Sequence, residues 1–380
     1  VFCLALCPFF RGSVVLGGGC CFPPGGGGLW GGGGGGGGDA PAPLLSGGIF
    51  HPTMDESSPN PDSVTKRTRL APSPTGALHL GNLRTFLVNA ALAHQRGWRV
   101  LMRVEDIDSP RVKPGAIDRT LETLEWAGLW WDEGPIIQSK DPMPYESAVE
   151  RLARSARAFP CEMSRREIES ALSAPHPGDP TPDRRESVYP KHLRPELVPR
   201  PFDDRETNWR FAVTDETVTF RDEFAGEQSF TPAQSVGDFP IWTKRGVPSY
   251  QLAVVVDDAR QGVTHVVRGD DLLDSTARQI MLAQALSLPA IESYIHLPLV
   301  LGPDGRRLAK RHGDTRLRRY RESGVAPERI VGLIAHWSGL TESPEPMRSA
   351  EFFERFDPAT MDRRPVIFDE EDESWLLQRD

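Results

Sequence analysis

The sequence predicts an α/β fold, and three observations support that prediction. Strand-like and helix-like patterns alternate at short intervals from Val64 onward, which is typical of α/β proteins. The first of these patterns are a strand, a helix and a second strand, so they form a βαβ unit. The chain has 380 residues, 38% of them hydrophobic, which is enough for two or three domains with a sizeable core and excludes wholesale disorder.

Hydrophobic periodicity predicts five elements in the first part of this region. They are a strand at residues 68–71, a helix at 79–95 that Gly97 ends, a strand at 99–104, and helices at 116–127 and 146–158. The segment 159–248 then breaks the α/β rhythm, because it is rich in Pro, Arg and Asp and contains only short β-like runs such as 216–220. We interpret this segment as an insertion.

The α/β rhythm returns after the insertion. The predicted elements are an apolar strand at 251–256, a strand at 264–267, a helix at 272–286, a strand at 295–301 and a helical pattern over 316–337. About 40 residues follow Leu340, which we expect to be too few for another ordinary domain.

The first 60 residues have a different composition from the rest of the chain. Half of the 36 glycines precede Ile49, including the unbroken run Gly31–Gly38. Such a sequence buries too little apolar surface to offset the entropy lost on ordering, so we expect a disordered leader over residues 1–60. Met54 is then a candidate start site, which N-terminal sequencing of the native protein would test.

The N-terminal apolar stretch and the cysteine content both favour a cytoplasmic protein. The apolar stretch Val1–Phe10 has no positively charged residues ahead of it and is broken by Pro8, so it predicts neither a signal peptide nor a membrane span. Four of the five cysteines lie in the leader, which leaves Cys161 and no disulfide framework. We therefore expect a cytoplasmic protein in a reducing compartment.

The charge balance limits how the chain can meet a nucleic acid. Lys and Arg number 44 against 53 Asp and Glu, which gives a net charge of −9 and a pI of about 5.6. A basic coat over the whole surface is excluded, so a polyanionic partner must be met by a local basic patch.

A turn between the first predicted strand and helix has the features of a phosphate site. Arg69–Gly76 reads RLAPSPTG, and Ala77–Asn82 reads ALHLGN. A strand-to-helix turn directs free backbone N–H groups and the positive end of the helix dipole at one point. His79 and Asn82 can donate hydrogen bonds there, and Gly81 allows close approach. Taken alone, HLGN is more often a proline-rich turn with a histidine near a helix cap.

Charged residues also follow other predicted strands, where open α/β sheets collect ligands. Glu105 follows the strand at 99–104, Tyr250 and Asp258 flank the one at 251–256, and Arg268 follows the one at 264–267. An amino-acid substrate needs a carboxylate for its ammonium group and arginines for its carboxylates. Considered singly, each such residue is as readily a helix cap or half of an ion pair, which is our interpretation of Asp257 and Asp258.

The stretch Arg69–Asn82 resembles the HIGH signature region of class I aminoacyl-tRNA synthetases, and APSPTG is typical of their glutamate and glutamine branch. Leu299–Arg311, with RLAKR at its end, is similar to the KMSKS loop, although Arg307 and Ala309 depart from the usual lysine and serine. The resemblance implies a Rossmann-like class I catalytic domain with an inserted α/β subdomain and a short helical C-terminal part.

The resemblance also implies roles for individual residues. His79, Asn82 and Lys310 are implied in catalysis, and the ATP site comprises His79, Gly81, Asn82 and Lys310, with Mg²⁺ bound to the nucleotide. The glutamate site that it implies is formed by Arg69, Leu70, Ala71, Pro72, Ser73, Glu105, Tyr250 and Arg268.

The expected organisation follows the same family. It comprises a leader at 1–60, the first half of the catalytic domain at 64–158, an inserted acceptor-binding-like subdomain at 159–248, the second half with the KMSKS-like loop at 249–314, and a helical part at 315–380 without an anticodon-binding domain. This pattern is similar to that of the glutamyl-Q tRNA(Asp) synthetases, which activate glutamate with ATP and transfer it to queuosine in the anticodon of tRNA(Asp).

Two alternatives stay open on the sequence. One is a shortened glutamyl-tRNA synthetase that charges the 3′ end of tRNA(Glu), and the other is a non-catalytic paralogue that binds nucleotide or RNA. For the favoured function we expect a monomer with L-glutamate, ATP and queuosine-bearing tRNA(Asp) as partners, and no membrane contact.

Many members of this family hold zinc in the insertion through Cys-x-Cys, a tyrosine and a cysteine four residues further on. Here Cys161 and Tyr189 match, but Met163 and Leu193 replace the other two cysteines. A tetrahedral zinc site needs four donors, so we predict no zinc. The possible replacement ligands are Glu162, His176 and His192.

Overall fold

The computed structural model describes residues 65–74, 78–107, 112–163, 167, 188–306, 308 and 315–378. The predicted leader at 1–60 with Met54 therefore lies outside the described residues, as do Ala77, His176 and Lys310. Of the helices in the described ranges, none combines the length and apolarity that crossing a bilayer needs.

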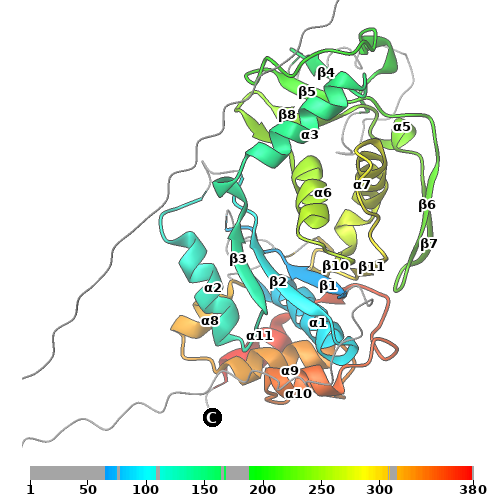
Figure 1. Ribbon diagram of the computed structural model, residues 1–380. Coiled ribbons are helices and arrows are strands. Elements are labelled where there is room, and N and C mark those ends of the chain that lie inside the picture. Colours follow the sequence, from blue (N-terminus) through cyan, green and yellow to red (C-terminus); the bar gives the residue numbers. More distant parts are fainter. Residues whose placement is uncertain are drawn as a thin grey trace, which may run out of the picture. The chain divides into compact units, whose positions relative to one another are not determined.

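The predicted βαβ unit is present and begins a parallel sheet (Figure 1). Strands β1 (Arg67–Leu70), β2 (Arg99–Val104) and β3 (Glu133–Ile137) lie side by side in that order, with all pairs parallel. Helix α1 (Leu80–Arg96) joins β1 to β2, and α2 (Ala116–Trp126) lies between β2 and β3 in the chain. Helix α1 ends at Gly97, whose φ of 65° is left-handed, the conformation for which glycine is suited.

The second half of the parallel sheet adds to the other side of β1. Strands β10 (His265–Gly269) and β11 (Ser293–Leu297) are parallel, and α7 (Leu273–Ala285) connects them after the short η4 turn (Asp270–Leu272). The N–H of Thr264 donates to the carbonyl of Arg67 (2.9 Å), so β10 runs beside β1. The order β3-β2-β1-β10-β11 is that of a doubly wound fold. The chain adds β2 and β3 on one side of β1 and adds β10 and β11 on the other, so the strand order reverses between β1 and β10.

The segment between the two halves forms its own sheet. Strands β4 (Ala158–Cys161), β5 (Asn208–Phe211), β8 (Phe239–Thr243) and β9 (Val247–Pro248) are antiparallel. The hairpin of β6 (Val218–Asp222) and β7 (Gly226–Phe230) leaves this sheet, and β6 pairs with β11 at Asp222 and Tyr294. Figure 1 shows the hairpin reaching from the inserted sheet down to the parallel sheet. Helix α3 (Met143–Arg154) precedes β4, and the one-turn α5 (Pro232–Ser235) precedes β8.

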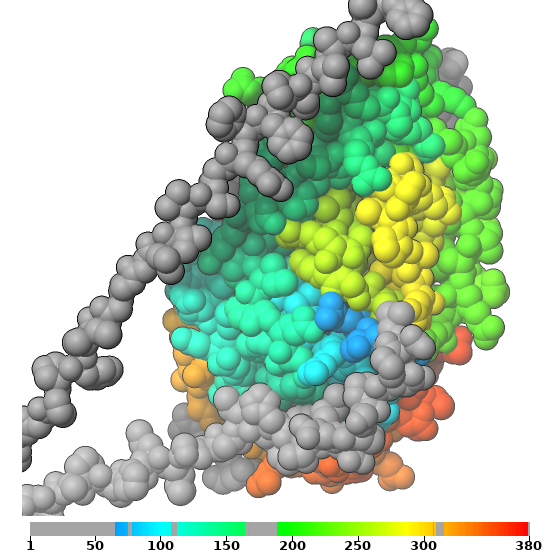
Figure 2. All heavy atoms as spheres, in the orientation of Figure 1, coloured from blue at the N-terminus to red at the C-terminus, as the bar shows by residue number. Residues whose placement is uncertain are grey.

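One predicted strand is wrong. Residues 251–256 belong to helix α6 (Tyr250–Arg260), in which Leu252 to Asp258 are all buried. A continuous apolar run is compatible with a strand buried on both faces or with a buried helix, and periodicity alone does not separate them. Helix α6 packs against α3, α7 and β8, which surround its apolar side chains. Its atoms, yellow-green in Figure 2, lie between the cyan first half and the yellow atoms of α7.

The predicted helical pattern over 316–337 is two helices, α8 (Leu317–Glu322) and α9 (Pro327–Trp337). Gly324 adopts a φ of 80° and Pro327 begins the next helix, so the chain turns between them. Helix α10 (Ser349–Arg355), the short β12–β13 pair (Val300–Leu301 with Val366–Ile367) and α11 (Glu370–Leu377) complete this part.

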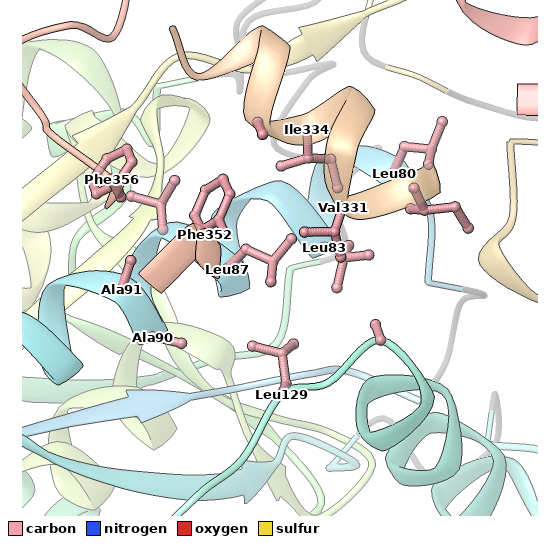
Figure 3. Packing of buried hydrophobic residues seen from close by; sticks show 14 of the residues in the cluster. Leu80, Leu83, Leu87, Ala90, Ala91, Leu129, Val331, Ile334, Phe352 and Phe356 are labelled. Atoms are coloured by element: carbon pink, nitrogen blue, oxygen red, sulfur yellow. The ribbon is translucent and has the colours of Figure 1, made fainter. Parts of the chain in front are cut away.

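A core joins these C-terminal helices to α1. Figure 3 shows Leu83 and Leu87 of α1 facing Val331 and Ile334 of α9 and Phe352 of α10. Each of these side chains is at most 1% exposed, and burying one contributes roughly 1.5–3 kcal/mol. This packing fixes α1, and therefore the position of its N-terminus, against the parallel sheet.

Candidate active site

A pocket of about 540 Å³ opens where the strand order reverses. It lies at the carboxyl ends of β1, β2 and β10 and at the N-terminal end of α1, which is where doubly wound folds bind their ligands. The sequence-predicted residues that line it are Arg69, Ala71, Pro72, Ser73, His79, Gly81, Asn82, Glu105, Tyr250 and Arg268. The fold thus brings together residues from four distant parts of the chain.

Among the predicted site residues that the structure describes, Leu70 does not line this pocket. Leu70 is fully buried in the hydrophobic core, because successive side chains of a strand point to opposite faces and Arg69 takes the pocket side. Lys310 lies outside the described residues, together with Arg307 and Ala309.

Arg69 is held at the base of the pocket. Its side chain is 4% exposed, its Nη1 donates to the Val267 carbonyl (3.2 Å), and its Nε lies 3.5 Å from Asp258 Oδ1. Burial lowers the pKa of the Arg69 guanidinium, and the carboxylate of Asp258 opposes that shift. Asp258 therefore has a structural role, as the sequence indicated, but it acts through ion pairs rather than as a helix cap.

Arg103 is a supporting residue that the sequence analysis missed. Its fully buried guanidinium donates to Asp258 Oδ1 (2.5 Å) and to Glu105 Oε1 (3.1 Å). Burial raises the pKa of the Glu105 carboxyl, while the charges of Arg103 and Arg69 oppose the shift. Arg103 and Glu105 are two positions apart, so both point to the same side of β2; that spacing was the signal in the sequence.

Tyr250 reaches the pocket from a different element than predicted. It is the first residue of α6 and not a residue beside a strand, because the run that follows it is helical. Its side chain is 40% exposed and lines the pocket.

The turn before α1 places its polar groups on the same pocket. His79 is the N-cap residue, and its backbone N–H donates to Asn82 Oδ1 (3.2 Å). The amide oxygen of Asn82 is therefore used in capping, which leaves its amide nitrogen to face a ligand. A Cβ on Gly81 would lie 3.3 Å from both His79 Nδ1 and Val300 Cβ, so a side chain there would displace its neighbours.

Arg268 differs from Arg69 and Arg103 in the groups that hold it, because its partners within the described ranges are neutral whereas Arg69 and Arg103 contact Asp258. Its Nε and Nη2 donate hydrogen bonds within the protein, whereas Nη1 has no partner among the described residues. The side chain is only 5% exposed and lines the pocket. A buried guanidinium N–H without a partner is unfavourable, so this position favours an anionic ligand.

A second pocket of about 880 Å³ adjoins the first. It lies between the inserted sheet and helices α6 and α7, and it shares Tyr250, Asp271 and Leu272 with the first pocket. Its polar lining includes Arg210 and Arg278. The shared residues connect the two spaces.

The remnants of the expected zinc site lie together in an apolar cluster. Cys161 Sγ is 3.9 Å from the Tyr189 hydroxyl, which donates to the Leu193 carbonyl (3.0 Å), and Met163 and Leu193 pack against this cluster. Within the described part of the chain, no three His, Cys, Asp or Glu side chains are grouped so that they could hold a metal ion. Because Met163 and Leu193 offer no zinc ligand beside Cys161 and Tyr189, this cluster does not fit a zinc ion; His176 lies outside the described residues.

Comparisons with known proteins agree with this fold. The family "tRNA synthetases class I (E and Q), catalytic domain" matches residues 65–375. A glutamyl-Q tRNA(Asp) synthetase of Symbiobacterium thermophilum is 45% identical over 310 residues, which cover 78% of this chain and 94% of that protein. The glutamyl-Q tRNA(Asp) synthetase of Rhodopirellula baltica is 44% identical, with 80% and 96% covered.

A solved structure gives the same result for the fold. The glutamate tRNA ligase of Elizabethkingia meningosepticum, in complex with its amino acid, superposes with a TM-score of 0.67 at 25% identity. The match covers 82% of this chain and 68% of the ligase.

Proposed function

Since this chain belongs to the class I tRNA synthetases of the glutamate and glutamine type, we propose that it activates L-glutamate with ATP and transfers the glutamyl group to queuosine in tRNA(Asp). The pocket at the strand-order reversal is the observation that carries this proposal, because it combines a helix N-terminus with buried arginines and a carboxylate. The two relatives named glutamyl-Q tRNA(Asp) synthetase support the acceptor, since they are covered over more than nine tenths of their length.

Glutamate fits the charged side of the pocket. The free Nη1 of Arg268 and the guanidinium of Arg69 suit a substrate carboxylate, and Glu105 suits the ammonium group. Arg103 and Asp258 hold Arg69 and Glu105 in place, so these charges are arranged before the substrate binds.

ATP fits the other side of the pocket, at the N-terminus of α1. The N-terminus of α1, the His79 side chain and the amide nitrogen of Asn82 suit phosphate oxygens, and Gly81 has no side chain to narrow this part of the pocket. Lys310 belongs, by its place after β12, to the loop expected to neutralise the leaving pyrophosphate. A carboxylate oxygen of glutamate attacks the α-phosphorus, the bond to the β-phosphate oxygen breaks, and pyrophosphate leaves.

The second step transfers the glutamyl group. A hydroxyl of the acceptor attacks the carbonyl carbon of glutamyl-adenylate, AMP leaves, and the hydroxyl proton is released. No enzyme nucleophile is needed in either step, so the protein acts by alignment and by electrostatic stabilisation of the phosphate. The second pocket, which shares Tyr250, Asp271 and Leu272 with the first, is our candidate for the acceptor side, bounded by the inserted subdomain that we place at residues 159–248.

The family implies Mg²⁺. The residues that line the first pocket fit this ion only when it is bound together with ATP. Mg²⁺ usually binds through one or two carboxylates together with substrate phosphates and waters. Asp271 lines the pocket and supplies one carboxylate. Bound in this way, the ion would neutralise phosphate charge. On this proposal the partners are L-glutamate, ATP and queuosine-bearing tRNA(Asp), and the chain acts as a cytoplasmic monomer.

The decisive experiment compares activation with acceptor choice. Glutamate-dependent exchange between pyrophosphate and ATP, without tRNA, should be present, and its absence would leave only a binding function. Radiolabelled glutamate should then enter tRNA(Asp) that carries queuosine, but not the same tRNA from a source that lacks queuosine. Labelling should survive removal of the 3′-terminal adenosine; labelling that depends on that adenosine would instead identify a shortened glutamyl-tRNA synthetase.

A further inference from the structure

We infer that His296 and Asp222 form a dyad that positions the Arg268 guanidinium for the carboxylate of the amino-acid substrate. This inference rests on the proposed function, because it takes glutamate as the ligand of Arg268. His296 lies on β11 directly beside Arg268 on β10, in parallel register. Neither His296 nor Asp222 lines the pocket, so their effect would pass through Arg268.

The hydrogen bonds determine the protonation state of His296. Its Nε2 accepts from Arg268 Nε (2.9 Å), and an arginine has only donors, so Nε2 must carry no proton. The proton then lies on Nδ1, which donates to Asp222 Oδ2 (2.7 Å). Burial lowers the pKa of the His296 imidazole, and this favours the neutral form that the contact with Arg268 requires.

Asp222 is itself firmly held. Its Oδ1 accepts from the backbone N–H groups of Phe224 (2.9 Å) and Ala225 (2.6 Å), and its carboxylate also accepts from the backbone N–H of His296. Asp222 is fully buried. A fixed carboxylate selects one tautomer of the imidazole and one ring orientation, as carboxylates do for histidines in metal sites and catalytic triads.

The dyad leaves one edge of the guanidinium for the ligand. Arg268 Nε is bound to His296, and Nη2 donates to Thr276 Oγ1 (2.7 Å) and more weakly to the Leu272 carbonyl (3.4 Å). The remaining nitrogen, Nη1, has no partner among the described residues, although the side chain is almost wholly buried. The protein therefore fixes the plane of the guanidinium through Nε and Nη2 and leaves Nη1, itself a buried atom, as the nitrogen without a partner among the described residues.

This arrangement gives the inserted segment a part in amino-acid binding. Asp222 is the last residue of β6, which reaches β11 from the inserted sheet. The inserted segment thus helps to position Arg268 through Asp222, although Asp222 itself does not line the first pocket. His296 and Asp222 are positioning residues, and their loss should affect glutamate more than ATP.

Two substitutions of His296 separate its two hydrogen bonds. The amide of an asparagine reaches roughly the position of imidazole Nδ1, whereas that of a glutamine reaches the position of Nε2. His296→Asn thus keeps a donor for Asp222 and removes the acceptor for Arg268, and His296→Gln keeps that acceptor. The matched control is His265→Asn: this histidine is also buried in the same sheet, but it contacts Trp98 and Thr264.

The readouts are the Kd for glutamate by calorimetry and the KM values for glutamate and ATP in pyrophosphate exchange. We expect His296→Asn to raise the Kd and KM for glutamate at least about tenfold with the KM for ATP unchanged, which corresponds to one lost hydrogen bond to a charged group. His296→Gln should recover most of the affinity, and His265→Asn should bind glutamate like the wild type. Thr276→Val, which removes the hydroxyl that contacts both Arg268 Nη2 (2.7 Å) and His296 Nε2 (3.2 Å), serves if His296→Asn does not fold.

The outcomes are distinguishable. Unchanged glutamate affinity in a folded His296→Asn, or equal losses for glutamate and ATP, would overturn the inference. A wild-type protein that binds glutamate without catalysing exchange would contradict the proposed function, while the His296 series would still decide the inference by calorimetry. A wild-type protein that binds no glutamate would overturn both.

Discussion

The three buried arginines around the pocket differ in the charge of the groups that hold them. Arg103 is fixed by Asp258 and Glu105, and Arg69 is fixed by Asp258 and the Val267 carbonyl. Within the described ranges Arg268 is fixed by neutral partners, and no carboxylate there forms an ion pair with it. Of the three, Arg268 is therefore the one whose charge and geometry together demand an external anion.

The Glu105 carboxylate should determine affinity for the substrate ammonium group. We expect Glu105→Gln to raise the KM for glutamate at least about tenfold in pyrophosphate exchange, because one charge-assisted contact is lost. Glu133→Gln, which removes an exposed carboxylate paired with Arg67, is the matched control and should leave the KM unchanged. A wild-type KM in the Glu105 variant would exclude this role.

The pKa of Glu105 also gives the sign of a pH effect. Burial raises it above the ordinary value of 4.5, so the carboxylate is protonated at a higher pH than an exposed glutamate would be. The KM for glutamate should rise as the pH falls through that raised pKa, since only the ionised form attracts the ammonium group. Measured from pH 8 downward, the rise should be smaller in Glu105→Gln, whose side chain does not titrate.

We expect Lys310 to contribute to adenylate formation, because it follows β12 in the KMSKS-like segment. If it neutralises the departing pyrophosphate, Lys310→Ala should raise the barrier to adenylate formation by about 2–4 kcal/mol, the range for one lost charge-stabilising donor. Lys191→Ala removes an exposed lysine of the inserted segment, which pairs with Asp215, and should leave exchange intact. Undiminished exchange in the Lys310 variant would refute the role.

The candidate site residues predicted from the sequence lie next to recognisable local features, and most of them line one pocket. Arg69, Glu105 and Arg268 each occupy or follow a predicted strand, and His79 precedes a clear amphipathic helix. His296 also lies in a predicted strand, at 295–301, but nothing in the sequence links it to Arg268 or to Asp222. His296 and Asp222 lie 28 and 46 residues from Arg268 in the chain, on strands whose neighbours are set by the fold, so only the sheet register brings the three together.

At the level of elements, a helix or strand was predicted correctly where the sequence pattern fits only one of the two. Helix α1 was predictable because its apolar residues recur at helical spacing and Gly97 ends it. The run at 251–256 was not, because Leu252 to Asp258 are all buried among α3, α7 and β8, so this run shows no polar face from which a period could be taken. Tyr250 was still placed correctly at the pocket, since it comes before the misassigned run.

The inserted sheet should be stable without metal. Met163 and Leu193 pack where two zinc-binding cysteines stand in many members of the family, so apolar contacts join β4 to the chain around Tyr189. We expect purified protein to contain less than stoichiometric zinc, and its Tm to be unchanged by a chelator such as EDTA. Stoichiometric zinc together with a lower Tm after chelation would show that other residues complete a site.

At the scale of the molecule, the two adjoining pockets suggest that activation and transfer use separate sets of residues. The first pocket is built by the parallel sheet and α1, and the second by the inserted sheet with α6 and α7. Tyr250, Asp271 and Leu272 line both. A protein with a net charge of −9 can bind a tRNA only through local basic groups, and Arg210 and Arg278 are such groups in the second pocket.

Arg278 allows this division to be tested. Its side chain is 7% exposed, and it donates to Ser275 Oγ (2.8 Å) and Asp274 Oδ2 (3.2 Å) at the second pocket. Arg278→Gln should lower glutamyl transfer to tRNA at least about tenfold, the effect of one lost charged hydrogen bond, with pyrophosphate exchange unchanged. Arg318→Gln, which removes an exposed arginine paired with Glu322 on α8, should affect neither reaction. Equal losses of exchange and transfer in Arg278→Gln would show that the second pocket serves activation too, because a residue confined to the acceptor side cannot slow a reaction that proceeds without tRNA.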